Sequence, residues 1–213
     1  MIMPAQIALG RGGATIAWNE YLRHLLNVSP MAWVIWFTGL PGCGKTTVAR
    51  RTKMLLDELG VRARILQLDE IRRVITPKPR YTEEEREIVY ASLAYMAKLL
   101  NDEGVNVIVD ACANRRRYRD LARRLIPHFG EAYVKAPIDV CIEREKERVA
   151  EYAPQGIYDK AASGAAVPGV NVSYEEPLDP EIEVDSSSMG VEEAARHVAE
   201  RIVALFADSD HLS

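Results

Sequence analysis

Residues 39–46 carry the strongest chemical signal in the chain. They read Gly-Leu-Pro-Gly-Cys-Gly-Lys-Thr and fit the pattern G-x-x-x-x-G-K-[S/T] without a mismatch. Glycines at three of these positions let backbone N–H groups crowd around phosphate oxygens, where a Cβ would clash. An apolar run, Trp33–Phe37, precedes the segment and a helical pattern follows it, which is the context that this motif requires. The segment therefore predicts a loop that binds the phosphates of a nucleotide.

Two side chains at the end of this loop are predicted to contact the phosphates and the metal ion. Lys45 is expected to reach the β- and γ-phosphates, and the Thr46 hydroxyl is expected to ligate Mg²⁺. The positive end of the following helix adds to the attraction for phosphate. ATP and Mg²⁺ are therefore the predicted cofactors, and the predicted ATP-binding residues of the motif are Gly39, Pro41, Gly42, Cys43, Gly44, Lys45, Thr46 and Thr47.

Two aspartates are the candidate acids. Asp69 stands at the end of a predicted strand, Ala63–Leu68, and Asp110 follows another, Val105–Val109. Because the carboxyl ends of parallel strands share one edge of a sheet, both acids are expected beside the phosphate loop. Asp69 is expected to orient an acceptor hydroxyl, take its proton or hold the metal through water. Asp110 is the second predicted metal ligand after Thr46, and the predicted catalytic residues are Lys45, Asp69 and Asp110.

Strands alternate with helices from Ala32 onward. The other predicted strands lie at 131–135 and 182–184, and the predicted helices lie at 45–59, 83–103, 116–125, 138–149 and 191–206. This alternation indicates an α/β domain with the P-loop NTPase fold, in which a parallel sheet carries helices on both faces. Residues 32–213 are expected to form this domain, and residues 1–31 an N-terminal extension with a short amphipathic helix at 18–26. Residues 153–172, rich in Gly, Ala and Pro, are predicted to be a mobile lid.

A phosphate loop does not by itself name a reaction. The chain lacks the N-K-x-D motif with which GTPases read guanine, and it is short for a motor or transporter ATPase. A small-molecule kinase needs an acid near the acceptor hydroxyl, side chains that bind the acceptor and a lid that excludes water. The chain offers candidates for all three, which favours transfer of a phosphoryl group from ATP to a small-molecule hydroxyl.

Several further segments carry a more specific pattern. They are W-F-T-G-L-P-G-C-G-K-T-T at 36–47, D-E-I-R at 69–72, A-P-I-D-V-C-I-E-R at 136–144, G-I-Y-D-K-A at 156–161, Tyr174-Glu175 and Pro180-Glu181. In this order they resemble the adenylylsulfate (APS) kinases over most of the chain from Ala32 to Asp185. The resemblance implies transfer of the ATP γ-phosphoryl group to the 3′-hydroxyl of adenylylsulfate, which gives PAPS.

The resemblance also implies roles for individual residues. Asp69 would be the carboxylate at the acceptor hydroxyl, and Arg72 and Arg86 would bind the charged groups of the acceptor. Arg144 and the loop after it would form the lid over ATP. Arg117 and Lys160 complete the predicted acceptor-binding set, and a homodimer is expected.

The acceptor side departs from the family pattern. An asparagine and two arginines of the family are replaced by Val89, Ala91 and Ser92, the lid lacks a lysine and a base-stacking phenylalanine around 167–169, and residues 146–152 are an insertion. A charge-assisted hydrogen bond contributes about 1.5–3 kcal/mol and a stacked base about 1–3 kcal/mol. Adenylylsulfate would therefore bind weakly unless other residues replace these contacts. The arginines at 115–117 are candidates for this, and the alternative is that they form the solvated face of a helix.

Two other functions stay open on the sequence. One is a kinase for a different hydroxyl, in a sugar, an activated sugar-like metabolite, a nucleotide or a polynucleotide end. The other is a nucleotide-binding regulatory subunit that turns over nothing.

Composition narrows the possible partners. The net charge of −4 argues against long nucleic acid as a partner. No apolar run reaches bilayer length and no signal peptide is recognised, so no membrane partner is expected. Three widely spaced cysteines suggest neither disulfides nor zinc, which fits a cytoplasmic location.

Overall fold

The computed structural model describes residues 31–147, 151–152 and 154–207. Strands and helices alternate through this part of the chain, as predicted. The elements are β1 (Val34–Thr38), α2 (Lys45–Glu58), β2 (Ala63–Gln67), α3 (Leu68–Ile75), α4 (Glu83–Asp102), β3 (Asn106–Asp110), α5 (Arg116–Leu125), β4 (Phe129–Lys135), α6 (Ile138–Glu147), α7 (Ile157–Ala162), β5 (Ile182–Asp185) and α8 (Val191–Ala207). The predicted helix at 18–26 and the end of the predicted helix at 138–149 lie outside the described residues.

The five strands form one parallel sheet in the order β2-β3-β1-β4-β5. Strand β1 is central, with Trp36 opposite Val109 of β3 and Glu131 of β4. Every residue of β1 is buried, which explains why its sequence is a continuous apolar run and not an alternating one. The predicted parallel α/β sheet is confirmed.

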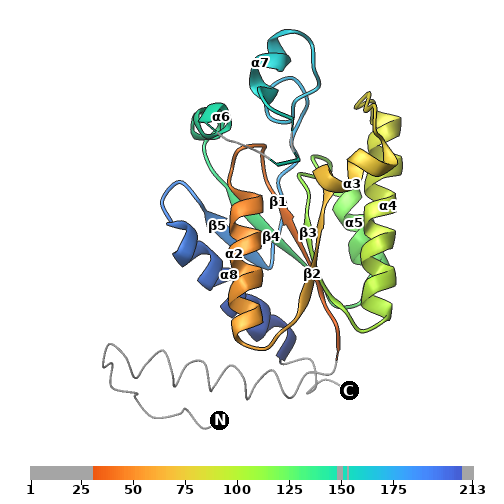
Figure 1. Cartoon of the computed structure of the whole chain (residues 1–213), viewed down its shortest axis with the longest axis vertical. Coiled ribbons are helices and arrows are strands. Elements are labelled where there is room, and N and C mark those ends of the chain that lie inside the picture. The colour runs from red at the N-terminus through yellow and green to blue at the C-terminus, as the bar shows by residue number, and fades with distance from the viewer. Residues whose placement is uncertain (1–30, 148–150, 153, 208–213) are drawn as a thin grey trace.

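Helices cover both faces of this sheet (Figure 1). Successive side chains of β1 point to opposite faces, so that Ile35 and Phe37 enter the core under α2 and α8. Val34 and Trp36 enter the second core, under α4 and α5. The loops that leave the carboxyl ends of the strands therefore meet at one edge, which is uppermost in Figure 1.

Helix α3 was not predicted, and the placement of Asp69 at the end of a strand is wrong. Strand β2 ends at Gln67, and Asp69 lies in the first turn of α3. The helix has acids in its first turn and Arg72 and Arg73 in its last turn, an arrangement that suits the helix dipole. Asp69 is still only two residues beyond the strand end, so it stays at the predicted edge of the sheet.

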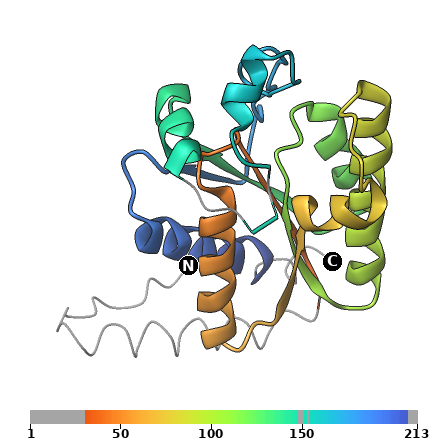
Figure 2. The ribbon, with the colours of Figure 1, turned by 45° about the horizontal axis from the view of Figure 1, so that its top comes forward.

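The segment predicted as a lid contains the short helix α7. Gly156 caps it in the left-handed conformation, and the chain leaves it through Gly164, which also has positive φ. A helix of six residues is too short to show a period in the sequence. Figure 2 shows α7 above the sheet edge, between α6 and the α4–α5 layer. No helix in the described part of the chain is long and apolar enough to cross a membrane.

Candidate active site

The loop between β1 and α2 packs closely on the elements beside it. A Cβ on Gly39 would lie 2.1 Å from the carbonyl oxygen of Val134, and one on Gly42 would lie 2.3 Å from the carbonyl oxygen of Cys141. Both glycines also have positive φ, so side chains there are excluded by contact and by backbone conformation. Cys43 is fully buried, and its small side chain packs against Gly39.

Lys45 begins α2 and folds back over the loop. Its Nζ donates to the carbonyl oxygen of Leu40 at 2.8 Å, and the residue is 9% exposed. Burial acts to lower the pKa of Lys45, but the negative groups around it, with Asp110 and Asp69 among them, outweigh burial and raise the pKa. The ammonium group is therefore charged at neutral pH and lies where an incoming phosphate would meet it.

Asp110 ends β3 beside Thr46. Burial raises the pKa of the Asp110 carboxyl, against the charge of Lys45 and a hydrogen bond from the Thr46 side chain. A hydroxyl and a carboxylate are thus brought together next to a phosphate loop. Hard oxygen ligands of this kind suit Mg²⁺, which commonly takes one or two protein ligands and completes its shell with water and phosphate.

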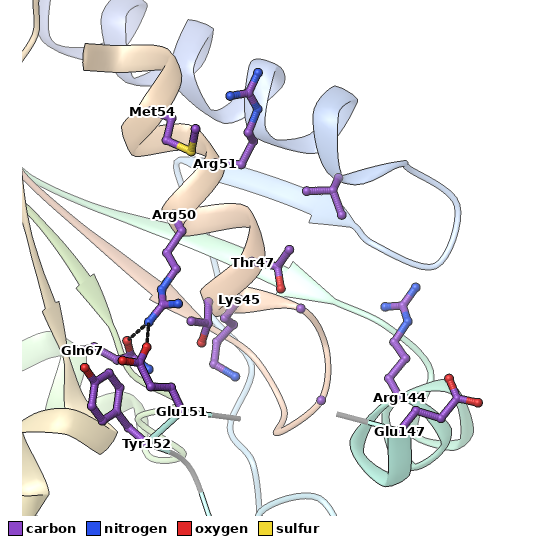
Figure 3. A pocket seen from close by; sticks show the side chains of 14 residues that line it. Lys45, Thr47, Arg50, Arg51, Met54, Gln67, Arg144, Glu147, Glu151 and Tyr152 are labelled. Carbon is purple, nitrogen blue, oxygen red and sulfur yellow. Dashed lines mark hydrogen bonds and ion pairs between the residues drawn. The ribbon is translucent and has the colours of Figure 1, made fainter. Parts of the chain in front are cut away.

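A cavity of about 710 Å³, here called the α2-side cavity, opens along the loop and α2. Figure 3 shows Lys45, Thr47 and Arg144 around it, with Arg50 reaching from α2 to Gln67 and Glu151. Gly42, Gly44 and Thr46 of the motif also line it. Of the predicted ATP-binding residues, Gly39, Pro41 and Cys43 do not line this cavity.

A second cavity of about 400 Å³, the α4-side cavity, lies on the other side of the loop. Lys45 and Thr46 line both cavities, so that they form the boundary between them. The predicted residues that line the α4-side cavity are Pro41, Lys45, Thr46, Asp69, Arg72, Arg86, Asp110 and Lys160. Both predicted acids and three of the four predicted acceptor-binding cations are thereby brought together.

Arg117 is the exception. Its guanidinium donates to Glu83 at 2.6 Å, its side chain is 54% exposed, and it does not line the α4-side cavity. Arg115 pairs with Glu175 at 3.0 Å, and the backbone N–H of Arg116 donates to the same carboxylate at 2.9 Å. The arginines at 115–117 therefore replace no contact in this cavity. Arg115 and Arg116 instead hold the motif residue Glu175 after the lid, and Arg117 pairs with α4.

The substituted family positions on α4 also lie outside the α4-side cavity. Val89 is 1% exposed and packs in the core. Ala91 and Ser92 do not line the cavity, and the Ser92 hydroxyl donates to the Ile88 carbonyl within α4. In the lid, Val167 lines the cavity with a small apolar side chain and is 2% exposed. The residues that stand at 89, 91 and 92 in this chain therefore contribute no charge to the lining of this cavity.

Tyr81 forms a wall of the α4-side cavity, a feature that the sequence analysis did not single out. Its backbone has the left-handed φ of 55°. The guanidinium of Arg72 lies 5.1 Å from the ring centroid and that of Arg86 lies 5.7 Å from it. An aromatic residue just before the Thr82 helix cap was the available sequence signal.

The lid is fastened on both sides of the site. The Tyr158 hydroxyl donates to the Pro41 carbonyl at 2.7 Å, and Nη2 of Arg86 donates to the Ala166 carbonyl at 2.9 Å. The Asn171 side chain closes the turn that follows these anchors by accepting from the Val167 N–H at 2.7 Å. Tyr158 belongs to the G-I-Y-D-K-A segment, so this motif joins the lid to the phosphate loop.

Arg144 contacts the loop after β5. It donates to the Ser186 hydroxyl at 3.0 Å and to the Ser186 carbonyl at 2.7 Å. The Ser186 hydroxyl in turn donates to the Cys43 carbonyl at 2.7 Å. Ser186 was missed from the sequence, although its position directly after a strand end followed the same rule that identified Asp110.

Comparison with known proteins agrees with this geometry. The model of the adenylylsulphate kinase family matches residues 31–185. The chain belongs to this family. It is 40% identical over 168 residues to a probable adenylyl-sulfate kinase of Pyrococcus abyssi, which covers 78% of this chain and 92% of that protein. It is 34% identical to the adenylyl-sulfate kinase of Halothermothrix orenii, over 78% of this chain and 86% of the other.

Solved structures give the same result for the fold. The Mycobacterium tuberculosis APS kinase in complex with AMPPNP and APS aligns with a TM-score of 0.71 and 28% identity, covering 81% of this chain and 98% of that one. The predicted family and the predicted P-loop NTPase fold are confirmed. A sugar kinase from Janibacter sp. HTCC2649, at 22% identity and a TM-score of 0.59 over 82% and 98% of the two chains, shares the fold.

Proposed function

We propose that this protein is an ATP-dependent adenylylsulfate kinase that phosphorylates the 3′-hydroxyl of adenylylsulfate to give PAPS. The observation that carries the proposal is that two cavities meet at Lys45 and Thr46, with Asp69 and Asp110 on the wall of the second. Phosphoryl transfer needs this arrangement, because donor and acceptor must lie in line across the transferred group. Membership of the adenylylsulphate kinase family supports phosphorylation of adenylylsulfate as the reaction.

The α2-side cavity is assigned to ATP. Backbone N–H groups of residues 39–46 would bind the phosphates, as in other loops of this pattern. Lys45 would leave the Leu40 carbonyl for the phosphate oxygens and stabilise the charge that develops on them during transfer. Arg144, held against the loop after β5, would cover the nucleotide.

The α4-side cavity is assigned to adenylylsulfate. Asp69 would accept the proton of the 3′-hydroxyl as its oxygen bonds to the γ-phosphorus and ADP leaves. Tyr81 offers a flat face for the adenine ring, which favours stacking. Arg72, Arg86 and Lys160 contribute positive charge around this cavity.

Thr46 and Asp110 are the proposed ligands of Mg²⁺, because both line the α4-side cavity where it meets the phosphate loop. When bound, the ion neutralises charge on the phosphates. The described residues contain no group of three or more His, Cys, Asp or Glu that could hold a metal. Phosphate and water would supply the other ligands of the ion.

The proposal is tested by ATP consumption that depends on adenylylsulfate. Lys45→Ala is expected to lower turnover by several orders of magnitude, because it removes charge stabilisation in the transition state. Lys53→Ala is the matched control, since Lys53 lies on the same helix and pairs with Asp57 at the surface. Asp69→Asn is expected to abolish transfer while calorimetry still shows ATP binding. Normal turnover in Asp69→Asn would remove Asp69 from the acceptor side.

Three further properties belong to the proposal. We expect a homodimer, as the family resemblance implies. A cytoplasmic location fits the free thiols of Cys43, Cys112 and Cys141. Residues 153–172 are proposed to open as a lid on a kinase domain spanning 32–213.

A further inference from the structure

We infer that Asn114 and Arg119 are positioning residues that hold Arg86 and the turn after β3 in place on the acceptor side of the site. Neither side chain lines the α4-side cavity, and both residues are fully buried behind its wall. Because Arg86 does line that cavity, a residue that fixes its guanidinium determines the geometry that an acceptor meets. The inference rests on the proposed function for the identity of that acceptor.

The Arg119 guanidinium joins three separate segments of the chain. Its Nε donates to Oε2 of Glu131 on β4 at 3.1 Å, its Nη1 donates to the carbonyl of Ala113, and its Nη2 donates to the carbonyl of Glu175 at 2.8 Å. The Arg119 side chain is 0% exposed and that of Glu131 is 7% exposed. An arginine offers a planar fork of donors that can hold a carboxylate and two carbonyls at once, whereas a lysine offers a single ammonium group.

The contact with Ala113 supports a turn that adjoins the cavity. Ala113 has a φ of 43°, in the left-handed region that residues with a Cβ rarely adopt. Its carbonyl accepts from Arg119, and its N–H donates to the Tyr90 hydroxyl at 3.1 Å. Such a conformation persists only where the surroundings impose it. The two residues before it, Ala111 and Cys112, line the α4-side cavity, so this turn determines where that part of the wall lies.

The Asn114 side chain connects the same turn to Arg86. Its Oδ1 accepts from Nη1 of Arg86 at 3.4 Å, and its Nδ2 donates to the Ser173 carbonyl at 3.1 Å. Because an arginine only donates and a carbonyl only accepts, this orientation of the amide satisfies both partners. The backbone carbonyl of Asn114 accepts from the Glu175 N–H at 2.8 Å. Asn114 therefore joins the cavity wall to the segment that follows the lid.

Arg86 carries this arrangement into the cavity. Its Nε donates to the Tyr81 carbonyl at 3.1 Å and its Nη2 to the Ala166 carbonyl at 2.9 Å, so that the contact with Asn114 is the third that fixes its plane. A guanidinium has five N–H donors, and these three contacts leave donors for a ligand. A side chain that is already held in its binding geometry loses less conformational entropy when a ligand arrives. Loss of Asn114 or Arg119 should therefore weaken the binding of the acceptor.

The test measures the KM for adenylylsulfate and the KM for ATP in Asn114→Ala, Arg119→Lys and the wild-type protein. Each variant is expected to raise the KM for adenylylsulfate about tenfold, equivalent to about 1.4 kcal/mol, with the KM for ATP nearly unchanged. Arg119→Lys keeps a positive charge opposite Glu131, so it removes the fork without leaving a buried carboxylate unpaired. An unchanged KM for adenylylsulfate in every variant that folds would overturn the inference.

Arg123→Gln is the matched control for a loss of stability alone. Arg123 lies one turn after Arg119 on α5, pairs with Glu181 at 2.5 Å and lies 3.6 Å from Glu131. None of these three residues lines the α4-side cavity. The control is expected to lower the melting temperature without changing either KM. A KM for adenylylsulfate that rises as much in Arg123→Gln as in Arg119→Lys would show a general effect of lost stability, which also overturns the inference.

Hydrogen exchange separates this inference from the proposed function, because it needs no acceptor. Exchange is followed by mass spectrometry of the ligand-free proteins, in peptides that cover residues 111–116 and 164–176. Both segments are expected to exchange faster in Asn114→Ala and Arg119→Lys than in wild type and Arg123→Gln. Equal exchange in all four proteins contradicts the inference. If the wild-type protein does not turn over adenylylsulfate, the proposed function fails, and the exchange rates still decide whether Asn114 and Arg119 hold these segments.

Discussion

Glu85→Gln should destabilise the turn that carries Tyr81. Glu85 accepts from Arg72 at 3.0 Å and from Tyr81 N–H at 3.3 Å with one oxygen, and from Arg80 N–H at 2.7 Å with the other. Glutamine keeps one carbonyl oxygen, so its best orientation loses at least one charge-assisted hydrogen bond. Each such bond contributes about 1.5–3 kcal/mol, and at 13% exposure of Glu85 solvent screening is small. We expect the free energy of unfolding to fall by about 2–3 kcal/mol at pH 7.

The effect should depend on pH in a defined direction. Burial acts to raise the pKa of Glu85, but hydrogen bonds from the Arg80 and Tyr81 backbone and from Arg72 outweigh it and hold the pKa below its ordinary value of 4.5. Because the folded-state pKa is lowered, the stabilisation is fully present above pH 4.5 and is lost as the pH falls through the lowered value. The difference between Glu85→Gln and wild type should therefore shrink in acid.

Urea unfolding at pH 7 and at several values below 4.5 would measure this difference. Glu84→Gln is the matched control, because Glu84 is an exposed acid of the same helical turn, and exposed substitutions usually change stability by less than about 0.5 kcal/mol. Equal stability of Glu85→Gln and wild type at pH 7 would refute the reasoning, as would a loss that persists undiminished at the lowest pH.

Three further changes test other contacts of the site. Tyr158→Phe leaves the Pro41 carbonyl without its 2.7 Å donor. We therefore expect the free energy of unfolding to fall by about 1–2 kcal/mol and the lid to be cleaved faster by proteases. An unaltered rate of proteolysis would contradict this. Gly42→Ala brings a Cβ to 2.3 Å from the carbonyl oxygen of Cys141, at a φ of +81°. Because the left-handed conformation alone costs about 1–2 kcal/mol, the affinity for ATP, measured by calorimetry, should fall at least about tenfold. Asp110→Asn should raise the melting temperature of the ligand-free protein at pH 7, since burial disfavours the charged form of Asp110 and raises its pKa. The variant should also need a higher Mg²⁺ concentration for turnover. A lower melting temperature of the variant would count against this reasoning.

The strands, the long helices and the phosphate loop were predictable because each has a strong local signal. The buried run of β1 reads as continuous apolar sequence, and α4 begins after Thr82, a residue type favoured as a helix cap, whose side chain accepts from the Glu85 N–H. Asp110 was placed correctly because it follows directly from a strand end. These features depend on neighbours in the sequence, so they can be read without the fold.

Other features depend on contacts between distant segments. Whether Arg117 faces the cavity or pairs with Glu83 is decided by the packing of α5 against α4. The commitment of Arg86 to Ala166 joins residues 80 positions apart. Short helices such as α3 and α7 have too few residues to show a helical period of apolar residues in the sequence. The motifs therefore identified these charged residues, whereas the groups that pair with them can be seen only in the folded structure.

The two anchors of the lid have a thermodynamic consequence. One anchor, at Pro41, belongs to the phosphate loop, and the other, at Arg86, belongs to the acceptor half of the site. A ligand that strengthens one anchor favours the lid conformation in which the other is also made. Linkage then requires ATP and the acceptor to alter each other's dissociation constants by the same factor, so that cutting one anchor should make the two bind independently.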